Sequence, residues 1–189
     1  MKEDALNRIE EFLAQFPLDN DIRQIDKKLK DEKPCRTLII GCLEEPLATH
    51  LAEQGFDVTG VDLRPYNCGD EYRGPDKPIY NHITGDFLDA KLDGLFDMII
   101  SISVIEHSGL GYYKDKIDHQ ADIRIMQKAA ELLAPKGRMM ITVPIGGVAY
   151  QTKHWRLYTP NTLKLLTAPF NVELLEYWQT SYLGREKVD

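Results

Sequence analysis

Ionisable side chains that could form a reactive site lie in two short stretches of the sequence. Glu106 and His107 come directly after one apolar run. The second stretch carries three such side chains at two-residue spacing: His154, Arg156 and Tyr158. Because imidazole titrates near neutral pH, His107 and His154 are candidate general bases. The Arg156 guanidinium is suited to bind a carboxylate or phosphate of a ligand. Single histidine, arginine or tyrosine residues more often have structural roles.

Two tyrosines follow His107 in a stretch that contains glycine. Tyr112 and Tyr113 come after Gly109 and Gly111, which is typical of a loop that covers a site and excludes water. In the second stretch, alternate residues of an extended segment point to one side. We therefore expect three residues to contact a substrate: Arg156, Tyr158 and Tyr113.

A glycine and a carboxylate mark a further candidate binding edge. The short apolar run at 37–40 is typical of a strand buried on both faces of a parallel sheet, and it ends at Gly41. Pro46 suits the first turn of a helix. A second strand at 56–62 then ends in Asp62, about twenty residues after the glycine. Together these segments predict a βαβ unit.

The same alternation continues along the chain. Further strands are expected near 79–83, 96–102 and 138–143, helices near 120–133 and 160–166, and an extended segment at 171–178. Such alternation predicts a doubly wound, mostly parallel α/β sheet with helices on both faces. Residues 1–33 carry two amphipathic patterns that predict N-terminal helices. We expect one domain over 1–189, with its core at 37–178.

Composition restricts the function classes. A chain of 189 residues suits one hydrophobic core, and a net charge of −7 disfavours a nucleic-acid partner. The three cysteines form no CxxC pair, so neither a metal site nor a disulfide framework is predicted. The first residues lack the features of a signal peptide, and no apolar stretch approaches the ~20 residues of a membrane span. A cytoplasmic protein with no membrane contact is expected.

In order along the chain, five short segments resemble the class I S-adenosylmethionine-dependent methyltransferases: residues 38–42, 60–62, 85–87, 96–101 and 133–137. The tail at 154–160 resembles the segment after the fifth strand in members that act on small molecules. Residues 103–111 resemble a branch grouped by sequence as a domain of unknown function. The resemblance implies a Rossmann-like fold, S-adenosylmethionine as cofactor, and methyl transfer to a small-molecule acceptor such as a sugar or another metabolite.

The resemblance also implies seven cofactor contacts: Gly41, Cys42, Glu44, Asp62, Asp86, Phe87 and Ser101. Gly41 would let the backbone approach the cofactor. The Asp62 carboxylate would accept hydrogen bonds from the two ribose hydroxyls. Asp86 would meet the adenine amino group and Phe87 would lie against the ring, but a turn or helix cap is the alternative role of this pair.

Several positions depart from the family pattern. Leu43 and Glu45 stand where later glycines are usual, and Ile39 replaces an acidic residue in the first strand. Glu44 or Glu45 is a candidate substitute for binding the methionine ammonium, unless both are solvated turn residues. The chain ends soon after the expected sixth strand, which leaves little room for the seventh strand of the standard sheet.

Methyl transfer requires alignment of donor and acceptor and, for a hydroxyl, removal of a proton, but it requires no metal. His107 is a candidate base, with a structural role in the cofactor pocket as the alternative.

Two other functions stay open. An NAD-dependent oxidoreductase would also use Asp62 after a glycine turn, although only Gly41 of the GxGxxG pattern is present. The altered turn also fits a catalytically inactive protein that binds S-adenosylmethionine or acts as a scaffold. The sequence leaves the acceptor and the oligomeric state open.

Overall fold

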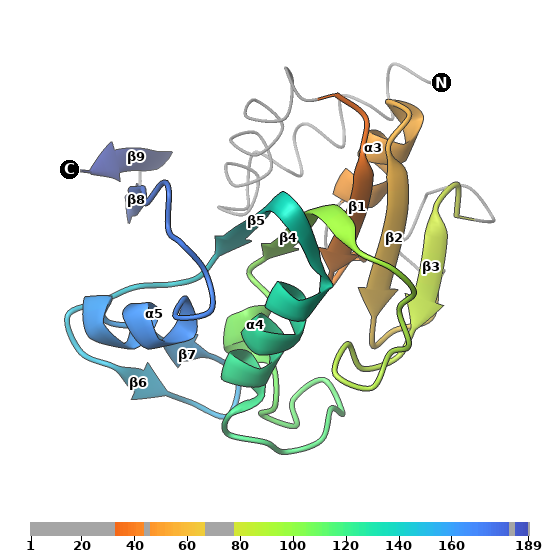
Figure 1. Cartoon of the computed structure of the whole chain (residues 1–189). Coiled ribbons are helices and arrows are strands. Elements are labelled where there is room, and N and C mark those ends of the chain that lie inside the picture. Colours follow the sequence, from red (N-terminus) through yellow and green to blue (C-terminus); the bar gives the residue numbers. More distant parts are fainter. Residues whose placement is uncertain (1–32, 44–45, 67–77, 182–183, 189) are drawn as a thin grey trace, which may run out of the picture. The chain divides into compact units, whose positions relative to one another are not determined.

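The computed structural model describes residues 33–43, 46–66, 78–181 and 184–188 (Figure 1). The helices expected within residues 1–33 and the candidate Glu44 lie outside these ranges. The chain divides into two compact units, one of residues 33–171 and one of residues 1–32 with 172–189. Each is described by itself below.

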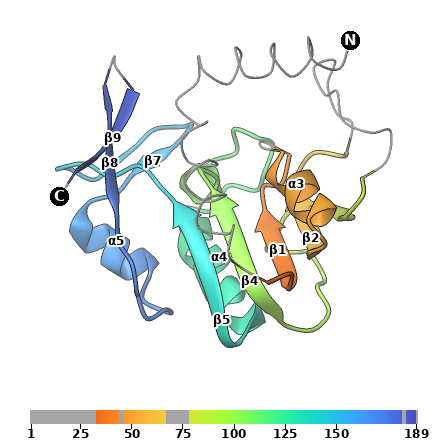
Figure 2. The ribbon, with the colours of Figure 1, turned by 90° about the horizontal axis from the view of Figure 1, so that it is seen from above.

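The larger unit contains a five-stranded parallel sheet with the strand order β3-β2-β1-β4-β5. Its strands are β1 (Arg36–Ile40), β2 (Asp57–Asp62), β3 (Asn81–Thr84), β4 (Phe96–Ile102) and β5 (Leu133–Thr142). The arrowheads of β1, β4 and β5 point the same way in Figure 2. Strand order reverses between β1 and β4, and ligands of open α/β sheets bind outside the carboxyl ends of strands at such a switch.

The strand β1 lies at the centre of the sheet, between β2 and β4. Leu38 pairs with Thr59 of β2 and with Ile99 of β4, and both Leu38 and Ile99 are fully buried. Burial on both faces explains the continuous apolar runs of β1 and β4. The predicted α/β sheet is therefore confirmed.

Helices cover both faces of the sheet. Helices α4 (Ala121–Leu132) and α5 (Pro160–Leu166) share one hydrophobic cluster with Leu38, Ile40 and Ile99. Helix α3 (Leu47–Glu53) buries its own apolar side outside that cluster, and the two views place it opposite α4 (Figures 1 and 2). The range of α5 matches the prediction, because Thr159 and Thr162 form a capping box and Pro160 occupies the first turn.

Strand β5 begins earlier than the sequence predicts. Leu133 pairs with Phe96 directly after α4, and a register shift between Phe96 and Met98 takes up the irregular stretch before Arg138. Lys136 there adopts a positive φ of 69°. The pairing with β4 therefore extends the strand back through a segment whose proline and glycine predict a turn.

Short elements follow the sheet. A 3-10 helix, η1 (Ile105–His107), comes after β4, and β6 (Tyr150–Gln151) pairs antiparallel with β7 (Arg156–Leu157). In the other unit, β8 (Tyr177–Ser181) and β9 (Gly184–Val188) form an antiparallel hairpin. This pair forms a sheet of its own, so within the described residues the parallel sheet lacks the seventh strand of the standard fold, as expected.

No helix in the described ranges is long and apolar enough to cross a bilayer. The expected cytoplasmic location stays a prediction.

Candidate functional site

The carboxyl ends of β1, β2 and β3 are held together by backbone hydrogen bonds. Gly41 N donates to Val61 O at 2.8 Å, and Gly85 N donates to Asp62 O at 2.8 Å. The sheet therefore brings Gly41 and Asp62 to one edge, as the βαβ pattern predicts. We call this edge, with Gly41, Cys42, Asp62 and Asp86, the Asp62 side.

Asp62 is a buried carboxylate that already has several donors. It is 6% exposed, and it accepts hydrogen bonds from the backbone N–H of Leu43 at 3.0 Å and of Arg64 at 3.0 Å. The Arg64 guanidinium donates to both oxygens, at 3.0 and 3.2 Å. Charge-assisted bonds of this kind fix the orientation of the carboxylate. The ion pair with Arg64 was not predicted from the sequence.

Gly41 is required by its own conformation and by a neighbouring side chain. Its φ is +75°, which disfavours residues with a Cβ, and a Cβ placed there would lie 2.3 Å from Cγ2 of Val104. At this turn the Gly41 backbone therefore packs closely against Val104, in the segment that follows β4.

The Cys42 side chain points into the protein. It is 3% exposed, its Sγ lies 3.5 Å from Nδ1 of His82, and Tyr80 donates to it at 3.8 Å. His82 Nε2 lies 3.3 Å from the Arg64 carbonyl, so an Nε2–H donor leaves Nδ1 to accept the thiol proton. Burial raises the pKa of Cys42 to about 12. Any ligand contact of Cys42 therefore comes from its backbone.

Of the three remaining cofactor candidates, Phe87 and Ser101 are buried and Asp86 is half-buried. Asp86 Oδ1 accepts from Leu88 N at 2.8 Å, and this is the turn role that the sequence left open. Phe87 is 5% exposed and belongs to the hydrophobic cluster, so its ring lies in the core instead of facing a ligand. Ser101 is fully buried, and its Oγ has no hydrogen-bond partner within the part of the chain that the structure describes.

A second group of candidates meets after β4 and β5. His107 Nδ1 lies 2.5 Å from the His154 carbonyl oxygen. The ring of Tyr113 packs edge-on against His107 at 5.8 Å, and Tyr112 packs against Tyr113 at 5.0 Å and against His154 at 4.2 Å. The topology predicted this meeting of segments distant in sequence. We call His107, Tyr112, Tyr113 and His154, with Glu106, the His107 side.

The hydrogen bond to His154 selects one tautomer of His107. A carbonyl accepts only from a protonated Nδ1, so Nε2 of the neutral ring keeps its lone pair. Glu106 Oε1 lies 3.8 Å from that Nε2 and accepts from Ser103 Oγ at 2.6 Å. Glu106 is 1% exposed. One nitrogen of the neutral ring is thus fixed as a donor and the other keeps a lone pair, an arrangement that suits a base.

The structure corrects the predicted role of Arg156. This residue is 6% exposed, and its Nη1 donates to the carbonyls of Ser108 at 2.6 Å and Glu106 at 3.4 Å. Its Nη2 donates to the His119 carbonyl at 3.5 Å, and its Nε lies 3.7 Å from Asp122 Oδ2. The guanidinium therefore holds the η1 segment and the start of α4 and does not face an acceptor.

Tyr158 is corrected for the same reason. It is 4% exposed, and its hydroxyl donates to Asp122 Oδ2 at 3.0 Å. Burial raises the pKa of Tyr158 well above its usual value, and the Asp122 charge adds to the effect. Asp122 joins Tyr158 and Arg156 in this network, and the sequence analysis did not identify it. Nothing in the spacing of Asp122 shows that it is buried.

The described residues contain no group of three or more His, Cys, Asp or Glu side chains arranged to hold a metal ion.

Residues 80–184 match the model of a family described as "Caenorhabditis protein of unknown function, DUF268". The chain belongs to the DUF268 family. The matched range of this DUF268 chain runs from β3 through the His107 side to the C-terminal hairpin.

Curated relatives of the DUF268 chain are ubiquinone biosynthesis O-methyltransferases. The protein from Rickettsia conorii is 30% identical over 109 residues, which cover 57% of this chain and 36% of that protein. The protein from Rickettsia felis is 31% identical over 88 residues, which cover 46% of this chain and 36% of that protein. The chain thus spans 36% of the length of these relatives.

Solved structures of methyltransferases share the fold. The 1,6-didemethyltoxoflavin-N1-methyltransferase of Burkholderia thailandensis, with bound S-adenosylhomocysteine, is 17% identical at a TM-score of 0.60, covering 94% of this chain and 82% of that one. The N-methyltransferase NodS of Bradyrhizobium japonicum, also with S-adenosylhomocysteine, is 17% identical at a TM-score of 0.59, covering 87% and 81%. The DUF268 chain therefore has the Rossmann-like fold of class I methyltransferases.

Proposed function

We propose that this chain is an S-adenosylmethionine-dependent methyltransferase that acts on a small-molecule acceptor. The observation that carries the proposal is the buried Asp62 carboxylate, fixed by backbone donors at the carboxyl end of β2 beside the switch in strand order. The O-methyltransferase names of the relatives and the S-adenosylhomocysteine in the similar structures support it.

The chemistry of the Asp62 side fits an adenosyl group. Two vicinal ribose hydroxyls are donors, and the two oxygens of one carboxylate are their natural acceptors. In this proposal the hydroxyls replace the Arg64 guanidinium, which is 37% exposed and so is the donor on Asp62 with room to move. At Gly85 an added Cβ would meet no described atom within 4 Å, which leaves space beside the β3 end.

The His107 side suits an acceptor that must lose a proton. S-Adenosylmethionine supplies a methyl group activated by a positively charged sulfur. His107 Nε2 takes the proton of an acceptor hydroxyl, and Glu106 stabilises the resulting imidazolium from 3.8 Å. Tyr112 and Tyr113 are 53% and 40% exposed and give the acceptor an aromatic surface to pack against. Hydroxyl-bearing metabolites are thus the proposed acceptor class.

Calorimetric titration of the full chain with S-adenosylmethionine, S-adenosylhomocysteine and NAD tests the proposal. We expect heat with the first two ligands only, followed by consumption of methyl donor over a panel of phenols, sugars and amines. No binding of either sulfur ligand refutes the proposal, and heat with NAD alone favours an oxidoreductase. Binding without turnover on any acceptor favours the catalytically inactive binding protein.

A further inference from the structure

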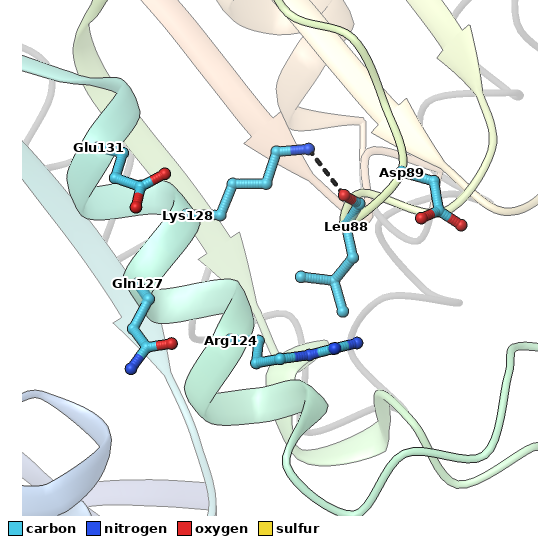
Figure 3. A pocket seen from close by; sticks show the side chains of 6 residues that line it. All are labelled: Leu88, Asp89, Arg124, Gln127, Lys128 and Glu131. Atoms are coloured by element: carbon cyan, nitrogen blue, oxygen red, sulfur yellow. Dashed lines mark hydrogen bonds between the residues drawn. The ribbon is translucent and has the colours of Figure 1, made fainter.

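A lysine of α4 binds the loop that follows β3 through three main-chain carbonyls. Lys128 Nζ donates to the carbonyl oxygens of Phe87 at 2.6 Å, Ala90 at 2.7 Å and Leu88 at 3.1 Å. An ammonium group has three N–H donors, so this loop uses all of them. Figure 3 shows the side chain reaching from α4 to the loop, with the bond to the Leu88 carbonyl.

The environment of Lys128 favours this position over a solvated one. Its Nζ lies 5.0 Å from the centre of the Phe87 ring, a cation–π contact. Burial lowers the pKa of Lys128, while the charges of Asp89, Asp86 and Glu131 act in the opposite direction. Holding one side chain against three carbonyls costs conformational entropy, which is offset by bonds to a charged donor.

The loop fixed by Lys128 begins at Asp86. Asp86 O accepts from Asp89 N at 3.1 Å and from Ala90 N at 2.9 Å, and its Oδ1 accepts from Leu88 N. Leu88, which donates to the Asp86 carboxylate, and Ala90, which donates to the Asp86 main-chain carbonyl, are therefore two of the three residues whose carbonyls Lys128 binds. A change at Lys128 is expected to reach Asp86 through Leu88 and Ala90.

We propose that Lys128 is a positioning residue for the adenine end of the cofactor site. It acts through the 87–90 loop, which it holds so that Asp86 faces the adenine amino group. This inference rests on the proposed function and assigns to Asp86, whose Oδ1 accepts from Leu88 N, the adenine contact that was expected from the sequence. It extends the site to a residue of α4 that no sequence pattern marks.

The test compares Lys128→Met with Gln127→Met in the full chain. Gln127 is the adjacent residue and lines the same surface hollow (Figure 3). Two ligands are titrated: S-adenosylhomocysteine, and S-inosylhomocysteine, in which a carbonyl replaces the adenine amino group. Hydrogen exchange of residues 86–92 is measured without ligand. Lys128→Arg, which keeps the charge and several donors, is the conservative variant.

We expect Lys128→Met to speed exchange in the loop and to weaken S-adenosylhomocysteine binding by about tenfold, with little change for S-inosylhomocysteine. Gln127→Met leaves both measurements unchanged, and Lys128→Arg restores most of the preference for the amino ligand. Equal weakening of both ligands, or unchanged affinity, overturns the inference while the proposed function stands. If the wild-type protein binds neither ligand, the proposed function fails and the inference fails with it.

Discussion

The Asp62 side and the His107 side are held in place by different kinds of interaction. Backbone hydrogen bonds between parallel strand ends fix Gly41 and Asp62. The His107 side lies in η1 and in the segments that follow β4 and β5, and the buried guanidinium of Arg156 ties these segments together through the carbonyls of Glu106, Ser108 and His119. The first arrangement follows from the sheet itself. The second depends on side-chain contacts, so single substitutions should affect it most.

The largest effect is expected from Arg156→Met. Removing the guanidinium leaves the Asp122 carboxylate buried without its cation, which typically costs about 3–5 kcal/mol. Urea unfolding followed by circular dichroism measures this loss of stability. The control is Arg124→Met, since the exposed Arg124 pairs with Asp118 and should contribute at most about 1 kcal/mol. Equal losses in the two variants would show that Arg156 does not hold the His107 side.

Substitution of the two histidines distinguishes a residue that acts through its side chain, His107, from one that acts through its main-chain carbonyl, His154. His107→Ala should lower turnover by roughly a hundredfold, because the proposed base is lost, while affinity for S-adenosylhomocysteine barely changes. His154→Ala should have a much smaller effect on turnover, since His154 contributes its carbonyl oxygen to the bond with His107. Steady-state kinetics on an identified acceptor, with ligand titration beside it, measure both. Full activity of His107→Ala would remove histidine as an essential base.

Asp62→Ala should weaken cofactor binding by about 1.5–3 kcal/mol, the range for hydrogen bonds to a charged group. Arg64→Met provides the contrast, because removing the competing guanidinium should leave affinity unchanged or increase it. Both are measured by calorimetry, with thermal melting to confirm that the variants fold. Weaker binding in Arg64→Met would mean that Arg64 assists the ligand and that the proposed replacement is wrong.

The smallest effect concerns the buried thiol of Cys42. The unfolded thiol loses its proton near pH 9, whereas the folded one keeps it up to about pH 12, so unfolding becomes easier as pH rises through this window. The change is at most about 1.4 kcal/mol per pH unit. Urea unfolding at pH 8 and 10.5 should show a greater alkaline loss for the wild type than for Cys42→Ala. Identical losses would contradict an internal, protonated Cys42.

Sequence patterns predicted the elements whose signals lie within a few consecutive residues. Strand β4 and helix α5 have the predicted ranges, because continuous apolar residues and a capped proline start are local signals. The position of Asp62 follows from strand topology. The partners of Asp62 and Arg156 were not predicted, since the spacing of charged residues does not show which of them become buried against distant carbonyls.

The strand order also has a consequence for how the chain folds during its synthesis. Strand β1 can pair with β2 early, but its other edge waits for β4, and the bond from Arg36 N to the Asp97 carboxylate joins residues 61 positions apart. Until β4 has been made, an apolar strand edge stays without its partner, and such edges promote aggregation. We therefore expect fragments of this chain that end before residue 102 to aggregate more readily than the full chain, which sedimentation of the expressed fragments would test.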